Sequence, residues 1–180
     1  MLVRAVTEYP AEPGFIRALA DLLRQGLQRW ASSAARIHVL FVAHGLPQNY
    51  TRRGDPYIDQ VQATRRALHN EYPDLPPSSL AYQGQVGPLK WHGPSVREAV
   101  ADCARNNCEV LCLVPLSFTC EHLETLHELD REAKELARRA GIPNFERIPT
   151  VACHPAFIAG LARLTLKAAG DWLGVETCTM

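Results

Sequence analysis

The sequence predicts an α/β protein: a four-stranded parallel sheet with helices on both of its faces. Two observations lead to this prediction. Short apolar runs alternate along the chain with patterns of helical period, as they do in repeated strand and helix units. The runs at 38–44 and 110–118 are apolar almost throughout, which is typical of strands that are buried on both faces.

The first part of the chain supplies two helices around one strand. From 14 to 31 an apolar residue recurs every three or four positions, and this spacing predicts an amphipathic helix. Its apolar face, which includes Phe15 and Leu19, packs either on the sheet of this domain or on a partner; the sequence leaves both interpretations open. A linker of small residues then leads to the strand at 38–44, and a helical pattern follows at 57–71.

The second part of the chain repeats this alternation. A short strand at 80–83 precedes a loop with several glycines and a helix at 94–105, whose proline suits a first helical turn. The apolar strand at 110–118 leads into a long helix at 121–140, and Gly141 closes that helix as a glycine cap. The remaining elements are a strand at 145–151 and a helix at 155–169.

We expect three segments: an amphipathic helix with its linker at 1–36, one α/β domain at 37–170 and a tail at 171–180. Nineteen basic side chains balance nineteen acidic ones, so nucleic-acid binding, which needs a basic stripe, is a poor hypothesis. The longest apolar runs fall far short of the roughly 20 residues that span a bilayer, and we expect no transmembrane segment. The first residues show no signal or transit pattern, which indicates a cytoplasmic protein.

Cysteines offer one alternative that we consider minor. The chain has six cysteines, and Cys103, Cys108, Cys112 and Cys120 lie close together in the sequence, as the ligands of an iron–sulfur cluster often do. Their spacings match neither common ferredoxin pattern, and Cys112 lies within a predicted buried strand, where cysteine acts as a small apolar residue. We therefore expect reduced thiols.

Polar side chains follow the predicted strands at their carboxyl ends, which is the edge where open parallel sheets bind ligands. These residues are His44 after the first strand, Tyr82 and Gln83 with nearby Trp91 after the second, Glu121, His122 and Glu124 after the third, and His154 after the fourth. An imidazole and a carboxylate from separate strands thus face one crevice. The sequence contains neither GxGxxG after a strand nor GxxxxGK[ST], so nucleotide binding loses its usual support.

The helix predicted after the third strand carries acidic residues three or four positions apart, which would form a stripe on one face: Glu121, Glu124, Glu128, Glu132 and Glu135. The ordinary interpretation is a solvated face whose charge nearby arginines and a lysine partly compensate. The alternative is a path of carboxylates that leads a divalent cation toward His44. His122 and His127 are five positions apart, which does not fit the helical zinc motif His-Glu-x-x-His.

At these residues the chain resembles the ferrochelatases, the family that catalyses the last step of haem synthesis. The matching segments, in family order, are Phe41-Val-Ala-His-Gly-Leu-Pro47, Arg53-Gly-Asp-Pro-Tyr57, Tyr82-Gln83, Val86-Gly-Pro88, Trp91, Pro115-Leu-Ser-Phe118, Glu121-His-Leu-Glu-Thr-Leu-His-Glu-Leu-Asp130 and His154-Pro-Ala-Phe-Ile158. The resemblance implies a chelatase-like fold. It also implies insertion of ferrous iron, as a substrate, into protoporphyrin IX or a close porphyrin, with release of two protons and without a permanent prosthetic group.

The resemblance also implies roles for individual residues. His44 matches the pocket histidine of the family, which accepts pyrrole protons or binds the metal, and Glu124 matches its carboxylate partner. The implied metal ligands are His44, Glu124, His122 and Glu128, and the implied porphyrin-binding residues are Trp91, Tyr82 and Pro47. Chemistry supports these roles independently, because a histidine that titrates near neutrality opposite a carboxylate can take up protons, and an aromatic side chain can stack on a macrocycle.

Ferrochelatases are built from two similar α/β halves with the porphyrin cleft between them, and this sequence resembles only the second half. One hypothesis is an active chelatase, formed either by a homodimer, as in single-domain chelatases of the same fold, or with a separate chain that supplies the first half. A second hypothesis is an inactive or partner-dependent half-domain. A third is a chelatase that loads cobalt or nickel into another tetrapyrrole; the block Glu124-Thr-Leu-His-Glu-Leu-Asp130 favours the iron enzyme.

Overall fold

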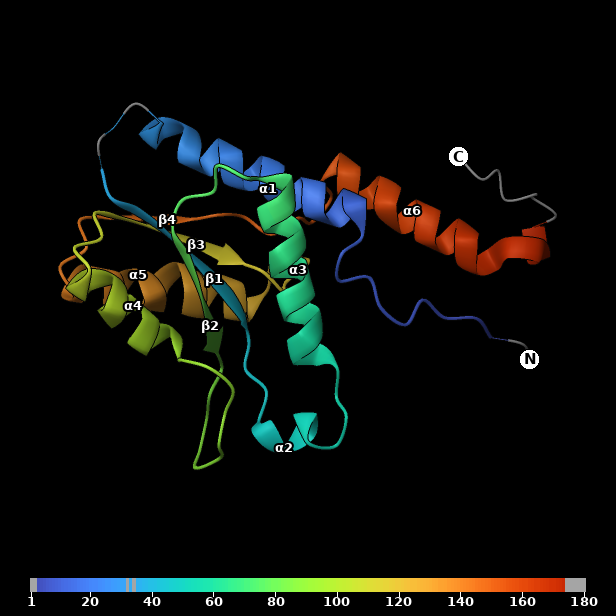
Figure 1. The fold of residues 1–180 in the computed structure, drawn as a ribbon, viewed down its shortest axis with the longest axis horizontal. Helices are drawn as coiled ribbons and strands as arrows, with labels where there is room; N and C mark the ends of the chain where they lie inside the picture. Colours follow the sequence, from blue (N-terminus) through green and yellow to red (C-terminus); the bar gives the residue numbers. More distant parts are fainter. Residues whose placement is uncertain (1–2, 32, 34, 174–180) are drawn as a thin grey trace.

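The structure, a computed structural model, describes residues 3–31, 33 and 35–173 (Figure 1). In these residues the strands are β1 (Ile37–His44), β2 (Ser78–Gln83), β3 (Val110–Pro115) and β4 (Asn144–Arg147). The helices are α1 (Pro13–Leu27), α2 (Gln48–Thr51), α3 (Tyr57–Glu71), α4 (Val96–Arg105), α5 (Ala133–Arg139) and α6 (Pro155–Ala169). A π-helix, η2 (Glu124–Glu132), runs directly into α5, and short 3₁₀ turns lie at Gln28–Trp30 and Gly170–Leu173.

The four strands form one sheet in the order β2-β1-β3-β4, and every neighbouring pair is parallel. This confirms the predicted fold class. The central strands β1 and β3 are the two that the sequence marks as apolar throughout, and β3 is buried along its whole length. Because all strands run in one direction, their carboxyl ends meet at one edge of the sheet, where His44 of β1 is the register partner of Gln83 of β2.

Helices cover both faces of the sheet, because successive side chains of a strand point to opposite faces. Phe41 and Val114 belong to a core that the sheet shares with α1, α3 and α6, whereas Leu40 and Leu113 belong to a core shared with α4, η2 and α5. Figure 1 shows α1 beside α6 in one layer and α4 beside α5 in the other.

The apolar face of α1 packs within this chain. Phe15, Leu19 and Leu23 are each at most 5% exposed and belong to the core formed with the sheet, α3 and α6. Of the two interpretations that the sequence leaves open for this face, the structure therefore supports packing on the domain's own sheet.

Several predicted boundaries are wrong by a few residues. β3 ends at Pro115 instead of 118, because Ser117 turns out of the strand to accept a hydrogen bond from the His44 N–H. β4 covers 144–147 instead of 145–151, since the Thr150 N–H is bonded to the Glu121 side chain instead of continuing the ladder. The first helix ends at Leu27 and passes into a 3₁₀ turn, a common helix ending.

The two helices predicted to start at 94 and 121 also begin later. Ser95 caps α4 through a reciprocal pair of hydrogen bonds with Glu98, so Val96 is its first residue. The helix predicted at 121–140 starts at Glu124, and its first nine residues form the π-helix η2. No helix in the described residues is long and apolar enough to cross a membrane. Residues 174–180 of the predicted tail lie outside the described residues.

Candidate active site

His44 lies at the carboxyl end of β1. Its backbone is held by Ser117, which follows β3, and by Tyr57, the first residue of α3. Its N–H donates to the Ser117 Oγ at 3.1 Å. The Tyr57 hydroxyl lies 3.1 Å from the His44 carbonyl oxygen and 2.9 Å from the same Ser117 Oγ. Burial raises the pKa of Tyr57 and outweighs these two hydrogen bonds, so this hydroxyl keeps its proton at neutral pH. These contacts hold the backbone of His44 in place.

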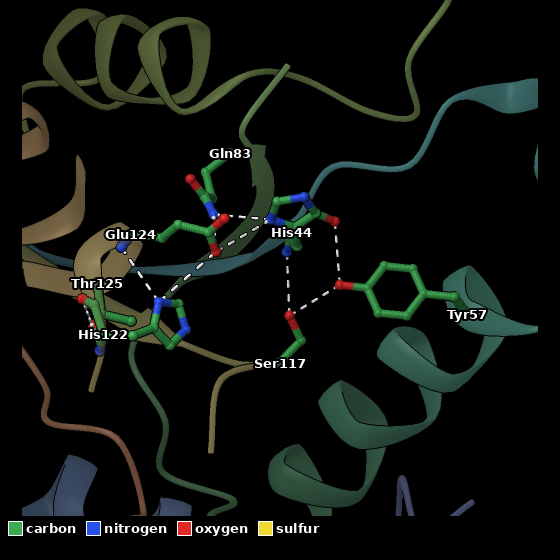
Figure 2. Close-up of polar contacts among 7 residues, drawn as sticks. All are labelled: His44, Tyr57, Gln83, Ser117, His122, Glu124 and Thr125. Carbon is green, nitrogen blue, oxygen red and sulfur yellow. Dashed lines mark hydrogen bonds and ion pairs between the residues drawn. The ribbon is translucent and has the colours of Figure 1, made fainter. Parts of the chain in front are cut away.

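Glu124, the first residue of η2, brings a carboxylate to the imidazole of His44 (Figure 2). Its Oε2 lies 3.6 Å from the His44 Nδ1 and 3.9 Å from the His122 Nδ1, so one carboxylate oxygen stands between two imidazoles. The backbone of His122 is held by Thr125, whose Oγ1 accepts from the His122 N–H at 2.9 Å and donates to the His122 carbonyl at 3.0 Å. The structure thus brings together three of the four predicted metal ligands.

Glu128, the fourth predicted metal ligand, lies on η2 four residues after Glu124. Its pKa is raised by burial and by the negative charges of Glu124 and Glu132, while His44 and His127 lower it less. The site is therefore lined by carboxylates that repel each other and favour an added cation. Among the described residues, however, no set of three or more His, Cys, Asp or Glu side chains is arranged to hold a metal ion.

Two of the predicted porphyrin-binding residues are neighbours at this edge. Pro47 and Trp91 form an antiparallel bridge, and the Trp91 ring packs on Gly45, directly after His44. The third, Tyr82, is 4% exposed and belongs to the core on the opposite face of the sheet, where its ring contacts Gly93. The structure therefore does not bring the Tyr82 side chain to His44, because Tyr82 and Gln83 point to opposite faces.

Gly84 lets the chain pass close to the His44 ring. Its φ is +72°, and a Cβ there would lie 3.0 Å from the His44 Cε1. Gly87 has a similar φ of +77° but nothing within 4 Å of the position of a Cβ. Both glycines adopt the left-handed region, which costs a residue with a side chain roughly 1 kcal/mol, but only Gly84 also meets the imidazole.

This difference gives a test of how tightly the ring is held. We expect Gly84→Ala and Gly87→Ala to lower the free energy of unfolding by a similar amount, about 1 kcal/mol from backbone strain. Only Gly84→Ala should also move the His44 ring, which NMR would detect as changed ring shifts of that histidine. Unchanged His44 signals in Gly84→Ala would contradict the close packing.

The predicted acidic stripe is divided among different partners. Glu121 binds Arg147, Glu135 binds Arg138 and Arg139, and Glu124 faces His44. His127 pairs with Glu132 at 3.4 Å, five positions on, which fits the i to i+5 period of a π-helix. Arg138 and Arg139 compensate Glu135, as the ordinary interpretation expects, whereas the carboxylates close to one another are Glu124, Glu128 and Glu132, so the five acidic residues do not form one uniform stripe.

The four cysteines that suggest a cluster do not converge. Cys103 and Cys108 precede β3, Cys112 lies within it, and Cys120 is exposed beyond its far end. Burial raises the pKa of Cys103 to about 11 and that of Cys112 to about 12, so these thiols stay protonated and are poor metal ligands.

Sequence reasoning missed the residues that support the site. Gln83 is placed at the carboxyl edge by the sequence but is given no role there, yet its amide bridges His44 and Glu124. Ser117 and Tyr57 also belong to matching segments, and Arg147 belongs to none. The carboxyl-end rule indicates Gln83, since it ends β2 beside His44, but nothing in the spacing reveals which way a side chain turns.

The arrangement supplies an imidazole next to a carboxylate, with further acidic groups behind them and an aromatic residue at the rim. Such a set can accept protons and attract a divalent cation. Exposed apolar side chains lie on the segments that follow β1, β2 and β3: Tyr50, Val86, Leu89, Leu123 and Leu126. Exposed apolar groups around a polar centre indicate a ligand with a large apolar body.

Residues 1–169 match the family model described as Ferrochelatase. The chain is 39% identical over 160 residues to the ferrochelatase of Synechocystis sp. (strain ATCC 27184 / PCC 6803 / Kazusa), in a match that covers 88% of this chain and 41% of the relative. It is 41% identical over 157 residues to the ferrochelatase of Cyanothece sp. (strain PCC 7425 / ATCC 29141), with 87% and 40% covered. The chain thus spans about 40% of the length of these curated relatives.

Two solved structures share the fold. SirB from Bacillus subtilis, in a structure with Fe³⁺, superposes with a TM-score of 0.60 at 14% identity, covering 88% of this chain and 56% of that one. A multi-domain protein of Deinococcus radiodurans, described as structurally similar to chelatases, superposes with a TM-score of 0.50 at 20% identity, covering 92% and 30%. At these identities the likeness shows the fold, which confirms the chelatase-like architecture.

Proposed function

The chain belongs to the ferrochelatase family, and from this premise we propose that it is a chelatase half that inserts ferrous iron into protoporphyrin IX or a close porphyrin. The observation that carries the proposal is the Glu124 carboxylate between the imidazoles of His44 and His122 at the carboxyl edge of the sheet. A porphyrin must lose two N–H protons as the cation enters. An imidazole beside a carboxylate can accept and pass on those protons.

The surroundings of this pair support the same reaction. The carboxylates of η2 attract a divalent cation, since the negative charges of Glu124 and Glu132 act on Glu128 and a neighbouring positive charge relieves this repulsion. Trp91 packs on Gly45 beside His44 and pairs with Pro47, and we propose that a flat macrocycle stacks against these two residues. Iron is a passing substrate in this scheme, which agrees with a ligand set that is open instead of closed into a coordination shell.

A second unit that completes the site is part of this proposal. The chain spans about 40% of the length of its relatives, and the exposed apolar side chains on the segments that follow β1, β2 and β3 have no cover among the described residues. We propose either a second copy of this chain or a separate first-half chain as that unit. The five described cysteines are free thiols, which supports action in a reducing compartment such as the cytoplasm.

The proposal is tested by the loss of porphyrin fluorescence when ferrous iron is added, without oxygen, to the purified chain. We expect turnover, and for a homodimer we expect specific activity to rise with chain concentration. Cobalt and nickel in parallel reactions distinguish the iron enzyme from a chelatase for another metal. A folded chain that gives no turnover at any concentration contradicts a stand-alone enzyme and leaves the partner-dependent half-domain.

A further inference from the structure

A separate pocket lies at β2, which is an outer strand of the sheet. Its volume is about 450 Å³, and it is lined by side chains of α3 and β2 and by the residues at 92–94. None of the described residues that line it is acidic. The pocket therefore differs in charge from the carboxylate-rich surroundings of His44.

Arg65 of α3 brings a positive charge into this pocket, and its side chain is half-buried. Within the described residues, its guanidinium donates only one long hydrogen bond, from Nη2 to the Ser78 carbonyl at 3.4 Å, and pairs with no carboxylate. Arg147, by contrast, binds two carboxylates. Because a guanidinium has five N–H donors, most of those of Arg65 are not used by the protein.

Tyr82 of β2 supplies a second donor to the same pocket. Its N–H donates to the Pro94 carbonyl at 2.9 Å, and its ring lies so close to Gly93 that a Cβ there would overlap it. Burial and Tyr57 raise the pKa of Tyr82, and the charge of Arg65 lowers it less, so the hydroxyl keeps its proton. Within the described part of the chain this hydroxyl has no hydrogen-bond partner.

Most other polar side chains of the pocket are already occupied. The two serine hydroxyls and the His92 ring have partners in the protein: Ser78 bonds to His69, Ser79 to His38 and His92 to Thr51. This leaves the donors of Arg65 and Tyr82, with the Gln62 amide three positions before Arg65 on the same helix.

We propose that this pocket binds a small oxyanion, the carboxylate or phosphate group of a free small molecule, between the Arg65 guanidinium and the Tyr82 hydroxyl. The planar fork of a guanidinium matches two oxygens of such a group, and the phenol donates from another direction. A half-buried positive charge without a counter-charge favours an anion over a cation. The pocket is distinct from the His44 centre, because Tyr82 and Gln83 point to opposite faces of the sheet.

The test follows the Arg65 side chain while an anion is added. The chain is labelled with ¹⁵N-arginine, and inorganic phosphate or acetate replaces chloride at constant ionic strength. The Nε signal of Arg65 is the one that is lost in Arg65→Gln. We expect this signal to shift and to saturate with a Kd of about 1 mM, the affinity that two or three charge-assisted hydrogen bonds provide. Whichever anion saturates at the lower concentration identifies the ligand as a phosphate or a carboxylate, and either result supports the proposal.

Tyr82→Phe removes only the hydroxyl and should weaken binding about tenfold. Arg66→Gln is the matched control, because Arg66 is the next residue of α3, is exposed and does not line the pocket; its affinity should equal that of the unaltered chain. An unaltered chain in which no arginine signal saturates overturns the proposal, even if Arg65→Gln does not fold. So does a folded Tyr82→Phe that binds the anion as tightly as the unaltered chain. The readout involves no metal insertion, so its result is independent of the proposed function.

Discussion

Glu124→Gln should reduce the rate of iron insertion by at least about 100-fold, the usual lower bound for the loss of a positioned acid or base. Glutamine keeps the shape of the side chain but removes the negative charge that lies 3.6 Å from the His44 Nδ1 and 3.9 Å from the His122 Nδ1. The amide neither accepts a proton nor stabilises an imidazolium. Initial rates of fluorescence loss with ferrous iron and saturating porphyrin measure the effect.

His44→Ala should cost a similar factor, and the double variant should be little worse than the poorer single variant. Groups that act as a unit lose their shared contribution when either is removed, so their effects do not add. Additive losses would show that His44 and Glu124 work in separate steps. The comparison therefore tests whether the short distance between them matters.

Glu135→Gln is the matched control for Glu124→Gln. Glu135 lies on the same helical run and pairs at the surface with Arg138 and Arg139, away from His44. Exposed ion pairs contribute about 0–1 kcal/mol, so this variant should fold and keep its activity. A rate for Glu124→Gln within about threefold of this control would exclude Glu124 from the chemistry.

The centre of the sheet could be predicted from the sequence because its two central strands consist almost entirely of apolar residues. The runs that became β1 and β3 are continuous, and continuous runs between helical patterns specify a buried parallel strand. The strand ends could not be predicted in this way, because polar contacts set them: Ser117 and Thr150 leave the ladder for His44 and Glu121.

The site could be predicted in part for a similar reason. The carboxyl-end rule places His44 and Glu124 at one edge without reference to any side-chain detail. The prediction of one acidic stripe assumed an α-helix at 121–140, whereas the first part of that helix is the π-helix η2. In η2 the backbone hydrogen bonds join residues five positions apart, so Glu132 pairs with His127. No pattern of residue types in the sequence predicts this change of helical period.

Arg147 ties η2 and the residues before it to β4. It is a β4 residue whose side chain is 13% exposed; its Nε and Nη2 bind the two oxygens of Asp130, and its Nη1 donates to the Glu121 Oε1 at 2.6 Å. These two carboxylates bracket Glu124 in the sequence, so one guanidinium fixes the segment that carries the Glu124 carboxylate.

We expect Arg147→Met to lower the free energy of unfolding by about 3 kcal/mol, the lower end of the cost of breaking a buried ion pair, because both carboxylates are about one-third exposed. Urea unfolding measures this value. Arg138→Met breaks a similar two-point pair on the exposed surface, where solvent screens the charges, and should cost much less. Equal losses in the two variants would contradict a special role for Arg147.

The loss of stability in Arg147→Met should also depend on pH. Burial raises the pKa of Glu121, but hydrogen bonds from Arg147, Thr150 and Thr125 outweigh it, and the net pKa lies below its usual 4.5. A lowered carboxyl pKa stabilises the fold above that value, and the contribution is lost as pH falls through the folded pKa. The difference in stability between the unaltered chain and Arg147→Met should therefore be constant from pH 7 to about pH 5 and shrink below 4.5. A difference that persists at lower pH would show that Arg147 acts through its hydrogen bond to the Ile148 carbonyl instead of by pairing with Glu121.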